Sequence, residues 1–220
     1  MADKKKTLRA AIDILMVALL PVLMAYSLVG ELLHEIAGTL MLALFIAHHI
    51  LNHRATAAMF RDRQTPERVF GTVVNLLLFA VMVLLPASGI LMSKRLYAFL
   101  PTEGLSLAAR TVHLLTSYWG FALMSVHLGQ HVDRMTVGMK KRKGVWLTVA
   151  SALTLIACYG AYEFIRRGLW QYMTLKTQFV FFDYDEPRIL FFAGYLSMIV
   201  FFAWIGYFAK KAFHMIGKKK

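Results

Sequence analysis

Two pairs of histidines with the same spacing are the residues of this sequence best suited to do chemistry. His34 and His48 lie on one apolar stretch and His113 and His127 on another, and the members of each pair are 14 residues apart. On an α-helix, this step advances about 21 Å along the axis and falls about 40° short of four full turns, so both imidazoles share a face. Two such helices side by side would offer two stacked pairs of nitrogen ligands. That arrangement suits two bis-histidine haems.

The elements that must position these histidines are predicted to be membrane-spanning helices. The chain has 220 residues, of which 59% are hydrophobic and 17% charged, and its mean hydropathy is +0.57. This composition is too apolar for an ordinary soluble domain. Six apolar runs are long enough, at about 20 residues each, to cross the hydrocarbon core as helices. They lie near Ala10–Val29, Leu32–Leu51, Val69–Met92, Val112–Leu128, Val145–Ile165 and Ile189–Ala209.

We therefore expect an all-α integral membrane protein with six transmembrane helices, the first four of which form a haem-binding four-helix bundle. This bundle covers residues 1–135. Residues 136–220 form a two-helix hairpin with an aromatic segment on the outer side. That segment is interpreted as lying on the membrane or over the outer haem, with an aromatic-belt anchor as the simpler alternative. Its acidic residues Asp183, Asp185 and Glu186 could instead dock a redox partner.

The distribution of the positive charges along the chain predicts the membrane topology. A net charge of +13 could suggest a nucleic-acid binder. However, 18 of the 25 Lys and Arg residues lie in the two terminal segments and in the second and fourth of the intervening loops, and the alternate loops hold 7. This is the positive-inside pattern, which places both termini in the cytoplasm and argues against nucleic acid as a partner. The predicted location is the cytoplasmic (inner) membrane of a prokaryotic cell, with lipid headgroups as the acidic neighbours.

The topology also decides how the histidines pair. The second and fourth spans run in the same direction, so His34 lies level with His113 on the outer side, and His48 lies level with His127 on the inner side. The inner site has alternatives. His49 lies beside His48, and His131 follows His127 by one turn, so His49 or His131 could ligate instead. A third site at the cytoplasmic rim, near His53, also stays open.

Residues near the predicted ligands suit a non-covalently held haem b at each site. Cys158 is the only cysteine, so no C-x-x-C-H attachment exists in this sequence. Each imidazole is expected to donate its other N–H to a carbonyl one turn earlier. Small residues could give the macrocycle room, and basic residues could bind its propionates. The small residues are Gly38, Gly120 and Gly129. The basic residues are Lys94, Arg95 and Arg110 near the outer site and Arg54 and Arg134 near the inner site.

At this point the chain resembles a known group of proteins. The spaced histidine pairs are similar to the cytochrome b architecture of respiratory complexes. More closely, LLHEIAGTLMLALFIAHHILNHR resembles a prokaryotic family of small membrane cytochromes b associated with flavinylation and catalogued as a domain of unknown function. SGILMS (Ser88–Ser93), HLLTSYWGFALMSVHLGQH (His113–His131) and QFVFFDYDEPRILFF fit it too, so the resemblance covers about Ala10 to Ala209. A departure is His53, where an aromatic residue is more expected.

The resemblance implies haem ligation by His34, His48, His113 and His127. It also implies extracytoplasmic partners that carry covalent flavin or iron–sulfur centres. A quinone site beside either haem stays open. The chain would then be an electron-transfer subunit of an oxidoreductase system rather than a self-contained enzyme.

Three other functions remain as alternatives. The first is a six-span ferric-reductase-like haem protein, which also carries spaced histidine pairs. The second is a transporter with a histidine proton relay, which would need acidic partners in mid-span, whereas Glu31, Glu35 and Glu163 lie at span edges. The third is a membrane anchor that binds zinc through His48, His49 and His53.

Overall fold

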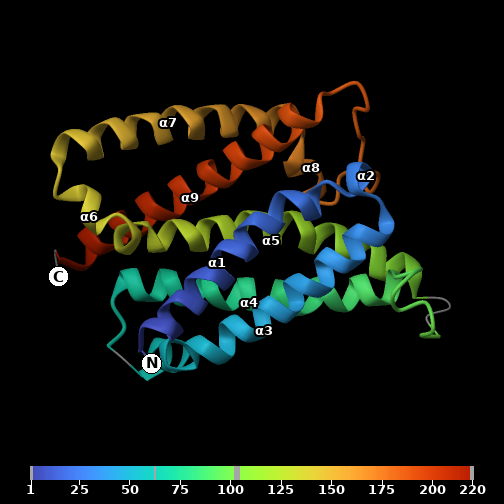
Figure 1. The fold of residues 1–220 in the computed structure, drawn as a ribbon, viewed down its shortest axis with the longest axis horizontal. Helices are drawn as coiled ribbons and strands as arrows, with labels where there is room; N and C mark the ends of the chain where they lie inside the picture. The colour runs from blue at the N-terminus through green and yellow to red at the C-terminus, as the bar shows by residue number, and fades with distance from the viewer. Residues whose placement is uncertain (1, 62, 102–104, 219–220) are drawn as a thin grey trace. The chain divides into compact units, whose positions relative to one another are not determined.

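Every secondary-structure element in the described part of the chain is a helix. The computed structural model describes residues 2–61, 63–101 and 105–218, so Lys219 and Lys220, counted above among the terminal charges, lie outside it. The helices are α1 (Ala2–Met24), α2 (Tyr26–Val29), α3 (Glu31–Arg61), α4 (Pro66–Met92), α5 (Ser106–Met135), α6 (Val137–Lys140), α7 (Lys143–Arg166), α8 (Leu169–Met173) and α9 (Arg188–Lys218) (Figure 1).

Glycine and proline mark several of the helix boundaries. Gly30, at the end of α2, has φ +80°, and Gly168, at the start of α8, has φ +61°. Residues with a Cβ rarely adopt such positive φ values, so glycine suits both turns. Pro66 opens α4, where its missing N–H costs nothing. The Thr65 hydroxyl caps the same helix by accepting a hydrogen bond from the backbone N–H of Arg68 at 3.3 Å.

The described residues form two compact units. Unit 1 takes residues from 1–62 and 82–117, and unit 2 takes residues from 63–81 and 118–220, so α4 and α5 each contribute to both. In unit 1, α1 packs antiparallel against α3, and the Arg9 guanidinium donates to the carbonyl of Leu51 at 2.5 Å. These units divide the chain differently from the predicted bundle of residues 1–135 and hairpin of residues 136–220. That functional division stays a prediction.

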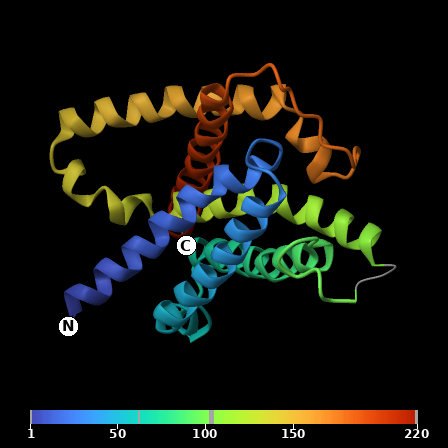
Figure 2. The same cartoon turned by 45° about the vertical axis from the view of Figure 1, so that its right-hand side comes forward.

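In unit 2, α7 and α9 form a hairpin held together by glycines. Figures 1 and 2 show the two helices approaching closely at the half of α7 that precedes α8. A Cβ at Gly160 of α7 would overlap the carbonyl of Ser197 on α9. On the α5 side, Gly206 packs on the backbone of Val126 in the same way. Such small residues let helix backbones approach each other when no water drives their association.

Five helices in the described part of the chain are long and apolar enough to cross a membrane. They are α3, α4, α7 and α9 over their whole lengths and α1 over Lys4–Met24. The first span therefore stops earlier than the predicted Ala10–Val29, because α1 ends at Met24 and Ala25, with φ −93° and ψ 30°, separates it from the short helix α2. The other spans are longer than predicted; α3, for example, continues to Arg61 rather than Leu51.

The predicted fourth span, Val112–Leu128, lies within α5 but is not one of the five. The helix is 30 residues long, which is ample, yet it carries polar residues along its length. Several of these are buried: Thr116, Ser125 and Gln130. Polar groups of membrane helices face the protein interior, so a helix enclosed by its neighbours needs less hydropathy than one that faces lipid. A sixth span at α5 stays a prediction.

Candidate metal centre

The two predicted outer ligands meet in unit 1. His34 projects from α3 and His113 from the first part of α5, and their ring centroids are 6.1 Å apart with the ring planes at 70°. Both side chains are half-buried. His34 and His113 are 79 positions apart in sequence, so this is a tertiary contact, brought about by packing within unit 1 rather than by local chain geometry.

Their separation suits two nitrogens that share one metal ion. A metal–imidazole bond is about 2 Å long, so two nitrogens on opposite sides of the metal are about 4 Å apart. Each ring centroid lies about 1 Å behind its nitrogen, because the ring bonds are about 1.35 Å long. The centroids of such a pair would be about 6 Å apart, close to the 6.1 Å found here. Two neutral imidazoles are the donor set of a b-type haem.

The second nitrogen of His113 has partners from α4. Its Nδ1 lies 3.1 Å from the carbonyl oxygen of Leu85 and 3.3 Å from the hydroxyl of Ser88. A Cβ at Gly89 would come within 3.1 Å of the His113 ring, so the missing side chain makes room for it. Donation from Nδ1–H to the Leu85 carbonyl leaves the Nε2 lone pair free to bind a metal. The expected carbonyl partner is therefore present, but α4 supplies it rather than the preceding turn of α5.

His34 differs from His113 in its second nitrogen. Its Nδ1 is buried and makes no hydrogen bond of good geometry with a described residue, although the backbone of Leu23 lies near the imidazole. The edge of the Tyr26 ring packs against the imidazole, with centroids 5.2 Å apart. A buried polar atom without a partner costs free energy. Such an atom in the candidate site is consistent with a site built to hold a polar or metal-containing group.

On the inner side, His48 and His49 occupy different faces of α3. At about 100° per residue, His34 and His48 both lie within about 20° of Met41, which is buried at the centre of the packed face, whereas His49 is turned about 80° away. His48 Nδ1 is 2.7 Å from the Asp13 carboxylate of α1. His49 Nδ1 is 3.0 Å from the carbonyl of Phe45, one turn earlier. Helix phase thus favours His48 as the ligand on α3.

His127, the other predicted inner ligand, belongs to unit 2. Its Nδ1 is 2.6 Å from the side-chain oxygen of Asn75 on α4, and its ring packs edge-on against His131 at 4.7 Å. Asn75 thus orients His127 much as Leu85 orients His113. His48 lies in unit 1, so the pairing of His48 with His127 stays a prediction.

A carboxylate fixes the loop that follows α4 near the outer pair. Glu35, next to His34, accepts hydrogen bonds from the Ser93 hydroxyl at 2.7 Å and from the backbone N–H groups of Lys94 and Leu96 at 3.0 and 2.8 Å. Thr39, one turn further along α3, hydrogen-bonds with the Tyr97 hydroxyl at 3.1 Å. These contacts anchor the loop that carries two of the predicted propionate-binding residues to the helix that carries His34.

The other residues predicted around the haems have mixed outcomes. The Arg95 guanidinium is exposed and lies 3.7 Å from Glu31, and Arg110 is exposed as well. Gly38 has room for a Cβ, which would lie 4.0 Å from Leu23, and Gly120 is buried. Their predicted contacts with haem stay predictions.

Gly129 has a packing role. A Cβ there would overlap the carbonyl of Ala203, so this glycine lets α5 approach α9 in unit 2. Close helix packing accounts for it without a macrocycle.

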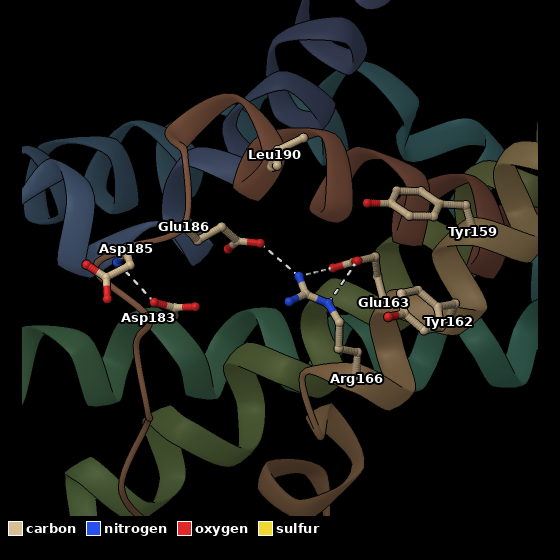
Figure 3. Close-up of a pocket in the computed structure, with 8 residues that line it drawn as sticks. All are labelled: Tyr159, Tyr162, Glu163, Arg166, Asp183, Asp185, Glu186 and Leu190. Carbon is tan, nitrogen blue, oxygen red and sulfur yellow. Dashed lines mark hydrogen bonds and ion pairs between the residues drawn. The ribbon is translucent and has the colours of Figure 1, made fainter.

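The acidic segment between α8 and α9 of unit 2 is only partly available for a partner. Glu186 accepts hydrogen bonds from Arg166 at 2.8 Å and from Arg167 at 2.7 Å, and Figure 3 shows Arg166 between Glu163 and Glu186. Asp183 and Asp185 are exposed and line an open pocket of about 370 Å³ at the end of α7. The aromatic residues divide similarly. Tyr172 is buried and stacks on Tyr118, whereas a second set is exposed: Phe179, Phe181 and Tyr184.

Sequence reasoning missed the residues that hold the second nitrogens of the histidines. Asp13 and Asn75 are single polar residues inside long apolar runs, which was a usable signal, since polar groups in membrane helices are costly and usually functional. The expectation that acidic partners are missing in mid-span was wrong, because Asp13 lies within the candidate span Lys4–Met24 and contacts His48. Gly89 and Leu85 gave no such signal.

The zinc-anchor alternative gains no support from the side-chain positions. Within residues 2–61, 63–101 and 105–218, no group of three or more His, Cys, Asp or Glu side chains is arranged to hold a metal ion. A structural zinc site needs four protein ligands. A haem needs only two, because the porphyrin supplies the other four nitrogens.

Comparison with protein-family models, with curated proteins and with solved structures finds no match to this chain. The resemblance to small membrane cytochromes b therefore stays a prediction from its sequence motifs. The functional interpretation rests on the geometry of the side chains described above.

Proposed function

We propose that this chain is a di-haem b-type membrane cytochrome. It would carry electrons across the membrane between a quinone or cytoplasmic donor and extracytoplasmic flavin or iron–sulfur proteins. The observation that carries the proposal is the meeting of His34 and His113 in unit 1, with ring centroids 6.1 Å apart. Two helices in the membrane that bring neutral imidazoles to this separation are suited to hold one haem between them.

The residues of the chain have distinct tasks in this proposal. His34 and His113 would hold the outer haem, and His48 with His127 the inner one; a bound haem supplies reversible one-electron chemistry. Leu85 and Asn75 fix the ring orientations of His113 and His127 by accepting their Nδ1–H groups.

In this proposal, the main task of the protein is to fix the positions and the surroundings of the two haems between which the electron moves. The 14 residues between positions 34 and 48 of α3 would separate the outer and inner haem sites by about 21 Å along the helix axis. The distance between the edges of two bound haems would be shorter. The five candidate spans are apolar enough for contact with lipid, which supports a membrane protein. Partners on the outer side remain a proposal that rests on the sequence resemblance.

The decisive experiment is a reduced-minus-oxidised absorption spectrum of the purified protein, with haem measured per polypeptide. We expect a b-type spectrum and two haems. Absence of any b-type signal after expression with an adequate haem supply would overturn the proposal. A stoichiometry of one or three would keep the cytochrome but change the ligand assignments.

Single-histidine variants assign the ligands. His34→Ala and His113→Ala should each remove the same one of the two haems, and His127→Ala should remove the other. His48→Ala and His49→Ala, made side by side, identify the inner ligand on α3. His214→Ala is the matched control, because this exposed histidine pairs with Glu67 and should leave both haems in place. Retention of both haems in His34→Ala and in His113→Ala would contradict the outer site.

The contact between Asp13 and His48 favours one second candidate, a proton relay. It supplies the acidic partner that this alternative lacked. A relay protein would show proton flux in vesicles and no haem spectrum, so the same purification separates the two functions.

A further inference from the structure

Asp13 is the last charged residue of α1 before its apolar second half. It lies in α1 one turn beyond Arg9, about 6 Å deeper along the helix axis, and the residues that follow it are apolar as far as Met24. A carboxylate in this setting is costly and needs a partner. Its partner is the Nδ1 atom of His48, 2.7 Å from one carboxylate oxygen.

The other candidate ligands have neutral partners. The second nitrogen of His113 faces the Leu85 carbonyl, and that of His127 faces the Asn75 amide oxygen. Among the described residues, His34 Nδ1 makes no hydrogen bond of good geometry. The Nδ1 partner of His48, in contrast, is the carboxylate of Asp13.

The charge of the acceptor matters for a ligating imidazole. A carboxylate that accepts the Nδ1–H bond draws the proton towards itself, so Nε2 becomes a stronger donor to the metal. The negative charge also favours the more positive, oxidised metal over the reduced one. Both effects lower the midpoint potential of the centre.

We propose that Asp13 is the positioning residue of the inner haem: it selects His48 as the ligand, fixes its tautomer and lowers the midpoint potential of that haem. This inference rests on the proposed di-haem function and adds to it a residue that sets the properties of one centre. Helix phase supports the choice of His48, since His48 shares the packed face of α3 with His34, whereas His49 donates to its own helix backbone.

The test is a redox titration of both centres in the purified Asp13→Asn protein. Asparagine keeps a hydrogen-bond acceptor of the same shape and removes only the charge. We expect two haems and an unchanged midpoint potential of the outer centre. The midpoint potential of the inner centre should rise by at least about 59 mV, which corresponds to a tenfold change in the one-electron redox equilibrium. The inner centre is identified as the one that survives in His34→Ala.

A matched control exists within the chain. Glu67 also accepts from a histidine, with 2.7 Å between its carboxylate and His214 Nδ1, but His214 is not a candidate ligand. Glu67→Gln should leave both potentials unchanged. Asp13→Glu should restore a potential close to that of the native protein, and Asp13→Ala should weaken inner haem binding by about 10- to 100-fold.

A reciprocal variant keeps the test sharp if Asp13→Asn binds haem poorly. Asn75→Asp places a carboxylate against His127 Nδ1 and should lower the potential of the centre that His127→Ala removes. Asp13→Asn protein with two haems and both potentials unchanged would overturn the role of Asp13, as would a shift confined to the outer centre. Absence of haem from the native protein would instead overturn the proposed function itself, so the two failures are distinguishable.

Discussion

Two helical hairpins of this protein each place a carboxylate in an apolar helix, and they treat it differently. In the α7–α9 hairpin, Glu163 is 2% exposed and pairs with Arg166 (Figure 3) and with Arg167, each at 2.8 Å. In the α1–α3 hairpin, Asp13 is 52% exposed and pairs with the imidazole of His48. The first carboxylate has two permanent positive partners, and the second has one partner that is neutral unless protonated.

The different partners of the two carboxylates distinguish a structural region from a region that contacts candidate ligands. Arginine stays charged and offers only donors, so a carboxylate between two arginines is locked into structure. Imidazole can bind a metal through one nitrogen while it donates through the other. We infer that the α7–α9 hairpin is a rigid support, whereas the α1–α3 hairpin holds groups that do chemistry.

The largest effect is expected at Glu163. Glu163→Gln leaves Arg166 and Arg167 with Glu186 as their remaining shared counter-charge. Breaking the buried part of this network costs about 3 kcal/mol, the lower end of the usual range because Glu186 stays and Arg166 is partly exposed. The free energy of unfolding in mixed detergent micelles measures it. If the hairpin is only scaffold, the haem content and both potentials of the folded fraction stay native. A changed potential would break the comparison.

A smaller loss of stability is expected where α7 meets α9. Gly160→Ala places a methyl group against the Ser197 carbonyl and should destabilise the protein by about 1–3 kcal/mol. Gly144→Ala, in the same helix, has nothing within 4 Å of its Cβ and should be neutral or slightly stabilising. Thermal unfolding of the two variants side by side checks this. Equal stability would mean that the glycine contact does not hold the hairpin.

A substitution at Gly89 tests the region that holds the candidate ligands. In Gly89→Ala, the new methyl group would come within 3.1 Å of the His113 ring, so the ring must shift. We expect a loss or spectral shift of the outer haem alone, with global stability changed by less than about 1 kcal/mol. The outer haem band, measured against the unchanged inner band, is the readout. A shift of the inner band instead would contradict the assignment of His113 to the outer site.

The smallest effect is expected at Ser88. Its hydroxyl lies 3.3 Å from His113 Nδ1, a longer contact than the 3.1 Å to the Leu85 carbonyl. Because the carbonyl remains in Ser88→Ala, both haems should be retained, with a destabilisation of about 0.5–1 kcal/mol. Loss of the outer haem in this variant would show that Ser88, rather than Leu85, orients the ring.

The sequence by itself determined that the chain is built from long apolar helices and which face of each helix carries the histidines. Both follow from local rules: hydropathy over about 20 residues and the fixed turn of about 100° per residue. The same rules placed His34 and His48 on one face of α3, which the structure confirms as the packed face. They could not settle the helix ends, because the break after Met24 lies at Ala25, inside an apolar run that carries no local helix-stop signal at that residue.

Only the tertiary structure decided what each imidazole contacts. The partners of His48, His113 and His127 lie 35, 28 and 52 residues away in the sequence, on other helices. Helical periodicity gives the direction of a side chain from its own axis, but the neighbouring helix and its rotation depend on packing across the whole unit. The sequence therefore named the candidate ligands, and the folded chain distinguished a histidine oriented by a carbonyl from one oriented by a carboxylate.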